Sequence, residues 1–148
     1  MKVINPVLPG FNPDPSLVRV GDDYYIATST FEWFPGICIH HSKDLVNWEI
    51  LSYALTDETK FDIKGMDTAC GIWAPNLTYD NGTFYLIYTI VYTNRHRFKD
   101  THNFMVTATD PQGPWSAFSR CALSAGTPSG KGFAGEMKLL KDFSGGIA

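Results

Sequence analysis

Alternating apolar and polar residues mark two β-hairpins along this chain. The segment 16–20 (SLVRV) precedes a Gly-containing turn and the apolar segment 24–31 (YYIATSTF). Further on, 76–80 (NLTYD) precedes an Asn-Gly pair at 81–82 and the segment 83–92 (TFYLIYTIVY). Glycine in a tight turn and the Asn-Gly dipeptide are strong signals of a hairpin. The pattern therefore predicts two antiparallel strand pairs.

Both faces of the segment 83–92 are apolar. Because side chains alternate along a strand, the first face holds Phe84, Leu86, Tyr88 and Ile90, and the second holds Tyr85, Ile87 and Val91. A strand with two apolar faces must be covered on both. A sheet packed between two neighbouring sheets meets this requirement.

The two hairpins resemble each other, and so do the segments that follow them. At a constant spacing of 60 residues, Pro15, Leu17, Tyr24, Tyr25 and Ile26 match Pro75, Leu77, Phe84, Tyr85 and Leu86. The segment 41–48 (HSKDLVNW) also parallels 107–115 (TATDPQGPW), each with an aspartate and a tryptophan. Four antiparallel strands in each repeat are typical of a β-propeller blade. We place blade one at about 10–56 and blade two at about 70–116.

Asp14 stands between two prolines, which fix φ on both sides of it and favour a preorganised carboxylate. The first hairpin places Asp14 roughly opposite Thr30 and Phe31. First strands of propeller blades line a central channel, so equivalent positions of adjacent blades are neighbours. Ala74 is the repeat equivalent of Asp14. We therefore expect Asp14, Phe31 and Trp73 to converge at one mouth of the channel.

A carboxylate beside aromatic rings suits carbohydrate chemistry. Sugars stack their C–H faces on aromatic side chains, and pairs of carboxyl groups hydrolyse glycosidic bonds. The alternative interpretation is a turn aspartate that accepts hydrogen bonds from nearby backbone amides.

Composition narrows the class of protein. Hydrophobic residues make up 44% and charged residues 18%, which suits a packed core, and the net charge of −3 argues against broad phosphate or nucleic-acid binding. Cys38, Cys70 and Cys121 have no metal-site spacing and are expected to be buried free thiols. His40 and His41 are adjacent on a strand and cannot chelate one ion, so no metal site is predicted. No signal peptide or membrane span is recognisable, which predicts a cytoplasmic protein.

Two stretches resemble the amino-terminal part of glycoside hydrolase family 43. They are 10–49 (GFNPDPSLVRVGDDYYIATSTFEWFPGICIHHSKDLVNWE) and 71–89 (GIWAPNLTYDNGTFYLIYT). Within the family, the chain is most similar to enzymes of the β-xylosidase and α-L-arabinofuranosidase type, from residue 4 to about 116. The resemblance implies an all-β, five-bladed β-propeller fold, of which this chain would hold about two blades.

The resemblance also implies roles for individual residues. Asp14 matches the general base of an inverting glycosidase, Phe31 and Trp73 match residues that line the substrate pocket, and Trp33 lies close by. The implied substrates are xylo- or arabino-oligosaccharides. No cofactor, nucleic acid or membrane is implied as a partner.

Beyond Ser116 the pattern stops. The tail 117–148 has no recognisable third blade, and its single glutamate, Glu136, lies in a short amphipathic run that favours a surface helix. We therefore expect a truncated chain with a divergent tail, frameshifted or disordered, that lacks the general acid and is inactive alone. The alternatives are a non-catalytic sugar-binding module and a β-rich scaffold or interaction protein whose open blade faces bind a partner. Open blade faces also favour self-association.

Overall fold

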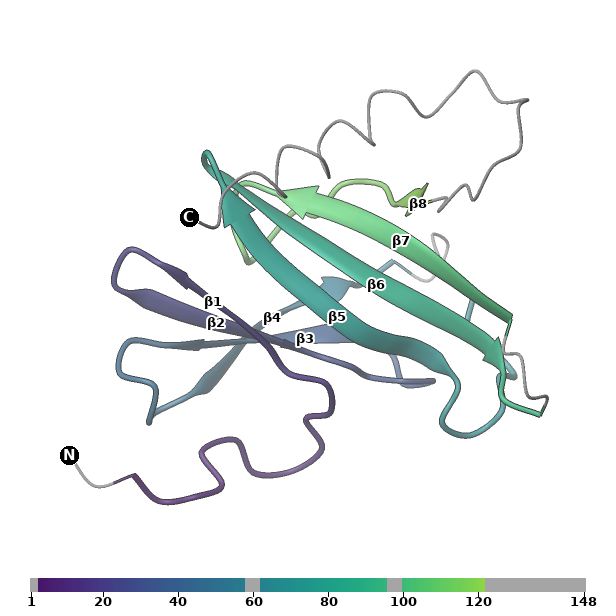
Figure 1. The fold of residues 1–148 in the computed structure, drawn as a ribbon, viewed down its shortest axis with the longest axis horizontal. Coiled ribbons are helices and arrows are strands. Elements are labelled where there is room, and N and C mark those ends of the chain that lie inside the picture. Colours follow the sequence, from purple (N-terminus) through teal and green to yellow (C-terminus); the bar gives the residue numbers. More distant parts are fainter. Residues whose placement is uncertain (1–2, 58–61, 96–99, 122–148) are drawn as a thin grey trace, which may run out of the picture.

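The structure is a computed structural model that describes residues 3–57, 62–95 and 100–121 of the chain. Within these ranges the chain forms eight β-strands and no helix (Figure 1). Accordingly, this part of the chain offers no helix with the length and apolar character needed to cross a membrane.

The strands form two antiparallel sheets of four strands each, and each sheet follows the order of the sequence. The first sheet consists of β1 (Ser16–Val20), β2 (Asp23–Thr28), β3 (Gly36–Ser42) and β4 (Glu49–Leu55). The second consists of β5 (Gly71–Asp80), β6 (Thr83–Thr93), β7 (Asp100–Ala108) and β8 (Ser119–Cys121). The predicted repeat of four antiparallel strands is confirmed.

The fourth strand of the second sheet lies later than expected. Blade two was placed at about 70–116, but β8 pairs with β7 only at Ser119–Cys121. The intervening segment contains Pro111 and Pro114, which have no backbone N–H to donate to a strand ladder. The second sheet therefore extends to Cys121.

Both predicted hairpins have two-residue turns. Val20 pairs with Asp23 across a turn that begins at Gly21, whose φ is 62°. At the second turn Asn81 and Gly82 have φ values of 45° and 82°, as a type I′ turn requires. The Asn-Gly dipeptide thus has the conformation that the sequence predicted.

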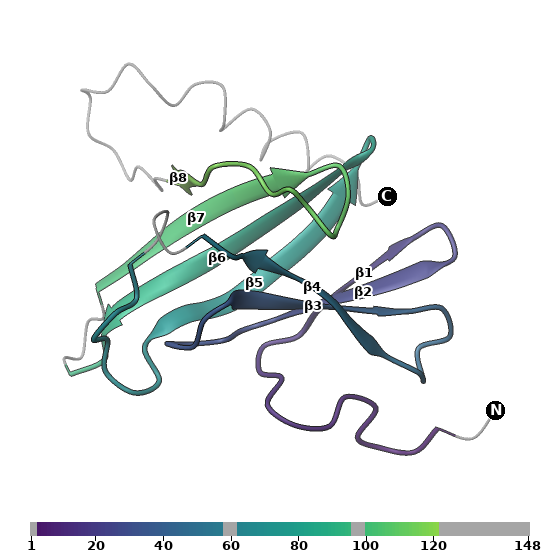
Figure 2. The same cartoon turned by 180° about the vertical axis from the view of Figure 1, so that it is seen from behind.

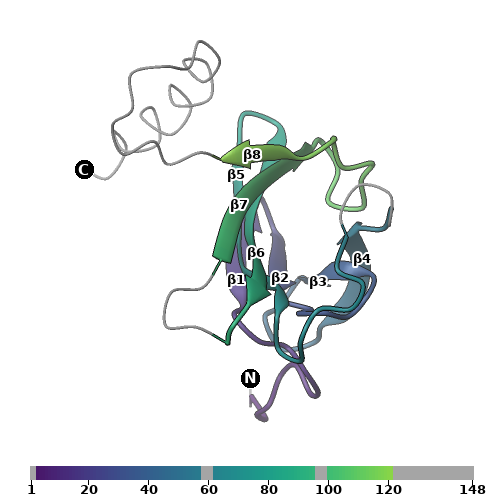
Figure 3. The same ribbon diagram turned by 90° about the vertical axis from the view of Figure 1, so that its right-hand side faces the viewer.

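The two sheets pack face to face, with β5 beside the β1 and β2 end of the first sheet (Figures 1 and 2). Phe84, Leu86, Tyr88 and Ile90 are buried in the shared core, as their common face predicted. From the first sheet the core receives Ala27, Ile37, Ile39, Ala54 and Leu55. Figure 3 shows the two sheets from the side. The side chains of the core lie between them.

Few polar contacts join the sheets, and each fixes their relative position. The Ser16 hydroxyl oxygen accepts a hydrogen bond from the Leu77 amide at 2.9 Å, and the Ser52 hydroxyl donates to the Pro111 carbonyl at 2.7 Å. Phe31 and Ile72 exchange two backbone hydrogen bonds, of 3.1 and 2.9 Å. The last pair joins the loop after β2 directly to β5.

The aspartate turns of the two repeats have the same construction. Asp44 Oδ1 accepts hydrogen bonds from the amides of Val46 and Asn47, at 2.9 and 2.7 Å, and these bonds hold the pKa of Asp44 well below its usual range. In the second repeat Asp110 Oδ1 accepts from the Gln112 amide at 2.8 Å. Side-chain oxygens that bind amides two residues on are the usual device of an Asx turn.

His41 lies between two carboxylates at the turn end of the first sheet. Its Nε2 lies 2.6 Å from Asp23 Oδ1, and its Nδ1 lies 3.2 Å from Glu49 Oε1. The hydrogen bond with Asp23 is the main cause that raises the pKa of His41. Lys43 binds the same Asp23 oxygen at 2.9 Å, and burial lowers the pKa of the neighbouring His40.

We expect His41→Gln to cost more stability at about pH 5.5 than at about pH 8.5. Because the folded-state pKa of His41 is raised, its charged form stabilises the fold fully below about pH 6.5, and this contribution fades as pH rises through the folded pKa. The pair is partly exposed, so the difference should be about 1 kcal/mol or less. Urea unfolding of the wild type and of His41→Gln at both pH values measures this difference. The titration of His40 affects both proteins equally, because both contain His40. An equal cost at both pH values would contradict the ion pair.

Candidate active site

Asp14 lies where the two sheets meet, and both sheets bind its carboxylate. The Ser29 hydroxyl donates to Asp14 Oδ2 at 2.8 Å, and the Ala74 amide lies 3.4 Å from the same oxygen. The Ala74 amide also donates to the Ser29 hydroxyl oxygen at 2.8 Å. Asp14 itself is exposed, whereas Ser29 is 1% exposed. A buried hydroxyl thus orients an open carboxylate.

The backbone at Asp14 is left-handed, with φ of 51°, and its repeat equivalent Ala74 has φ of 43°. Such a conformation costs about 1–2 kcal/mol in a non-glycine residue. Residues of this kind persist where the surrounding structure holds them, often at functional sites. The sequence predicted a rigid position for Asp14 but not this conformation.

Asp14 lies opposite Ser29, one residue before the expected Thr30 and Phe31. The ladder pairs Ser16 with Ala27, and the Ser29 amide then donates to the Pro13 carbonyl at 3.0 Å. Pairing Asp14 with Thr30 requires a turn centred near residue 22, whereas the turn lies between Val20 and Asp23. Counting back from a two-residue turn would have found Ser29.

Aromatic rings form a wall beside this carboxylate. The ring centroids of Phe31 and Trp73 are 5.9 Å apart, and those of Phe11 and Phe31 are 5.3 Å apart. Trp33, which is 59% exposed, contacts Phe11 at 5.1 Å. The structure therefore brings Asp14, Phe31 and Trp73 to one place and puts Trp33 at the outer end of the wall. Phe11 was missed because it precedes every predicted strand.

Trp73 is also fixed through its indole nitrogen, which donates to the Ala69 carbonyl at 2.9 Å. The Ala69 amide donates to Glu32 Oε2 at 3.2 Å. The sequence predicted no role for Glu32 or Ala69. The loop that contains Ala69 has no periodic pattern, so its contact with Glu32 could not be predicted.

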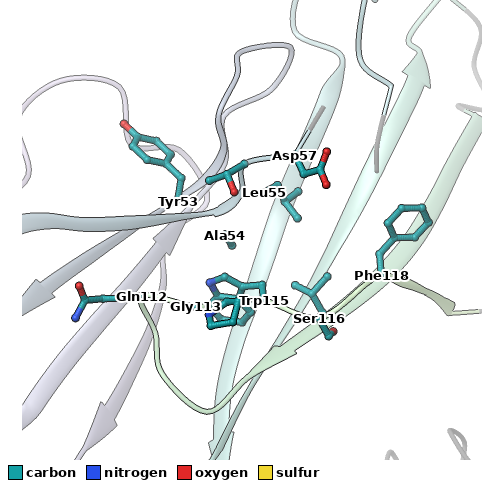
Figure 4. A pocket seen from close by; sticks show the side chains of 12 residues that line it. Tyr53, Ala54, Leu55, Asp57, Gln112, Gly113, Trp115, Ser116 and Phe118 are labelled. Atoms are coloured by element: carbon teal, nitrogen blue, oxygen red, sulfur yellow. The ribbon is translucent and has the colours of Figure 1, made fainter. Parts of the chain in front are cut away.

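Two pockets lie near these elements. One, of about 460 Å³, is lined by Phe11, Ser29 and Trp33 and continues over the first sheet toward Trp48 and Tyr53. The other, of about 180 Å³, lies between the end of β4 and the segment 112–118. Figure 4 shows its lining side chains, which include none of the Asp14 cluster. The first pocket adjoins the candidate site through Ser29, Phe11 and Trp33, whereas Asp14, Phe31 and Trp73 are not among its lining residues.

Among the described residues, no group of three or more His, Cys, Asp or Glu side chains could hold a metal ion. Cys38 and Cys70 are buried free thiols as predicted, whereas Cys121 is only partly buried. Glu136 and the tail from 122 onward lie outside the described residues.

The sequence model of the family described as "Glycosyl hydrolases family 43" matches residues 3–133. The chain belongs to this family. The match runs past Ser116, where the visible resemblance was expected to stop. Together with the fold, it identifies the two sheets as blades of the β-propeller found in this family.

Curated relatives are similar over most of this chain. Xylosidase/arabinosidase 43B of Humicola insolens is 56% identical over 115 residues, which cover 78% of this chain and 21% of that protein. A β-xylosidase of Bacillus subtilis is 55% identical over 116 residues, which cover 78% of this chain and 22% of that protein. The chain thus spans about a fifth of the length of these relatives.

Solved structures of the family share the arrangement of the strands. The xylan β-1,4-xylosidase of Bacillus halodurans superposes with a TM-score of 0.78 at 59% identity, over 80% of this chain and 23% of that one. A GH43B protein of Bacteroides ovatus gives 0.69 at 45% identity, over 78% of this chain and 22% of that one.

We expect Gly71→Ala to destabilise the protein far more than Gly82→Ala. Gly71 has φ of 92°, and a Cβ there would lie 2.3 Å from the Phe31 carbonyl oxygen, so the Phe31–Ile72 bridge would have to open. Gly82 has φ of 82° with no atom within 4 Å of a Cβ, so its variant carries the backbone strain alone. The difference should be about 2 kcal/mol or more in urea unfolding. Equal costs would contradict a supporting role for the bridge.

Proposed function

We propose that this chain provides the general-base half of the active site of an inverting glycosidase that acts on the ends of xylo- or arabino-oligosaccharides. The observation that carries the proposal is the hydrogen-bonded position of the Asp14 carboxylate beside Phe31 and Trp73. Relatives named xylosidase and arabinosidase support the substrate class.

Asp14 is placed to act on a water molecule. Within the described part of the chain, the donors Ser29 and Ala74 both bind Oδ2, which leaves Oδ1 available as the proton acceptor. In an inverting reaction the base removes a proton from the water that attacks the anomeric carbon, while an acid protonates the leaving oxygen on the opposite face. A base held in one orientation loses little freedom when the substrate binds.

Phe31 and Trp73 supply a surface for a sugar ring. Both rings are partly exposed. Phe31 lies in the loop after β2 and Trp73 in β5, and the planes of the two rings are inclined at 56°. An aromatic face binds the C–H face of a sugar, whereas polar groups such as the Asp14 carboxylate select its hydroxyls or the attacking water. This combination favours a terminal sugar unit at the meeting point of the two blades.

We further propose that the chain lacks the general acid and has little or no activity alone. The proposal is supported by the span of the chain, about a fifth of its relatives, and by the engagement of Glu32 with the Ala69 amide. A general acid typically contributes about 10²–10⁴-fold to the rate.

We expect the purified chain to show no measurable hydrolysis of xylobiose, and at most slow turnover of an aryl β-D-xyloside or α-L-arabinofuranoside. An aryl leaving group needs less protonation, so its hydrolysis should depend on Asp14 even where the acid is absent. Asp14→Asn is the matched control. Xylobiose turnover that Asp14→Asn abolishes would contradict the absence of an acid.

The aromatic wall also favours a second function, which is sugar binding without catalysis. Its rings all belong to this chain and need no catalytic group to bind a sugar. We expect Trp73→Ala to weaken xylobiose binding about fivefold or more in titration calorimetry. Tyr79→Ala serves as the control, since Tyr79 is 37% exposed, pairs with Phe84 beside the Asn81–Gly82 turn and lines neither pocket. If both variants bind as tightly as the wild type, the wall is not the sugar site.

A further inference from the structure

The loop that precedes β5 determines where the indole of Trp73 lies. The Trp73 indole N–H donates to the Ala69 carbonyl at 2.9 Å, which ties the position of the ring to that of Ala69. Ala69 and Gly71 have positive φ values of 65° and 92°, and the Cys70 amide donates to the Asp67 carbonyl at 3.0 Å. The strand ladder begins only at Gly71, which pairs with Val91, so the position of the turn residues before it depends on other contacts.

Glu32 holds the turn from the side of the first sheet. Its Oε2 accepts the Ala69 amide at 3.2 Å in a partly buried position. The same residue, Ala69, thus binds a carboxylate with its N–H and the Trp73 indole with its C=O. Glu32 follows Phe31 directly, so the bond ties together the two segments that carry the two rings.

An ion pair holds the turn from the side of the second sheet. The guanidinium of Arg95, just beyond β6, binds both carboxylate oxygens of Asp67, with Nε 2.6 Å from Oδ2. The pair holds the pKa of Asp67 below its usual range. Bidentate pairs of this kind fix geometry as well as charge. The turn from Asp67 to Gly71 is therefore anchored at both ends.

We propose that Glu32, together with the Asp67–Arg95 pair, positions Trp73 for sugar stacking. Glu32 acts through the Ala69 peptide and does not touch the substrate. What it supplies is a hydrogen-bond acceptor, because its partner is a neutral backbone amide. The consequence for sugar binding rests on the proposed function of Trp73, whereas the control of the indole position does not.

The test measures the solvent exchange of the Trp73 indole proton by NMR in the full chain labelled with ¹⁵N-tryptophan. A Trp73→Phe variant assigns the signal. We expect Glu32→Ala to shift this signal and to speed its exchange about fivefold, the change that corresponds to the loss of one hydrogen bond. Glu32→Gln keeps an acceptor oxygen and should restore slow exchange. Glu49→Ala, which removes a carboxylate bound to His41 instead, should leave the signal unchanged.

Unchanged exchange in Glu32→Ala would overturn the proposal, and so would failure of Glu32→Gln to rescue. The Trp48 and Trp115 signals report whether each variant is folded. If Glu32→Ala does not fold, Arg95→Met decides, because the Arg95 side chain is 72% exposed and its removal leaves the core intact. That variant should speed exchange about twofold, and no change would overturn the proposal. A separate xylobiose titration tests the proposed function: an unperturbed wild-type Trp73 signal would refute sugar stacking without affecting the positioning result.

Discussion

The two backbone hydrogen bonds between Phe31 and Ile72 are the contact on which the candidate site depends. They join the loop after β2 to the start of β5, so they set the distance between the residues that each sheet contributes. The close approach requires Gly71, since a side chain there would collide with the Phe31 carbonyl. The hydrophobic core holds the sheets together, but it is not directional. Together with the Ser16–Leu77 and Ser52–Pro111 bonds, these two bonds define the register of one sheet against the other.

The repeat is symmetrical in its backbone and asymmetrical in its chemistry. Asp14 and Ala74 occupy equivalent positions and share a left-handed conformation. In the first blade this position presents a carboxylate, whereas in the second it presents a backbone amide that lies within hydrogen-bonding distance of that carboxylate. The same unusual turn thus provides an acceptor in one blade and a donor in the next. A duplicated element can build a site in this way without any new backbone shape.

Regular elements were predictable from the sequence because their patterns repeat. The hairpin turns, the four-stranded units and the convergence of Asp14, Phe31 and Trp73 all follow from periodicity and the constant spacing of 60 residues. The hydrogen-bonding partners of Asp14 and Ala69 could not be predicted from the repeat. Ser29 needs a register accurate to one residue, and Glu32 acts through a loop whose shape is set by tertiary contacts. The position of β8 depends on prolines, whose effect on pairing varies with context.

Burial differs between the two faces of the two-sheet unit. Ala27 faces the second blade and is fully buried, whereas its repeat equivalent Ile87, on the far face of β6, is partly exposed in the described structure. The interface between the two blades therefore places the Asp14 carboxylate, its two donors and the contact of Phe31 with Trp73. Under the proposed function, the acid on the opposite face of the sugar would come from groups outside this cluster. The interface between these two blades thus holds all the groups that the proposed function assigns to this chain.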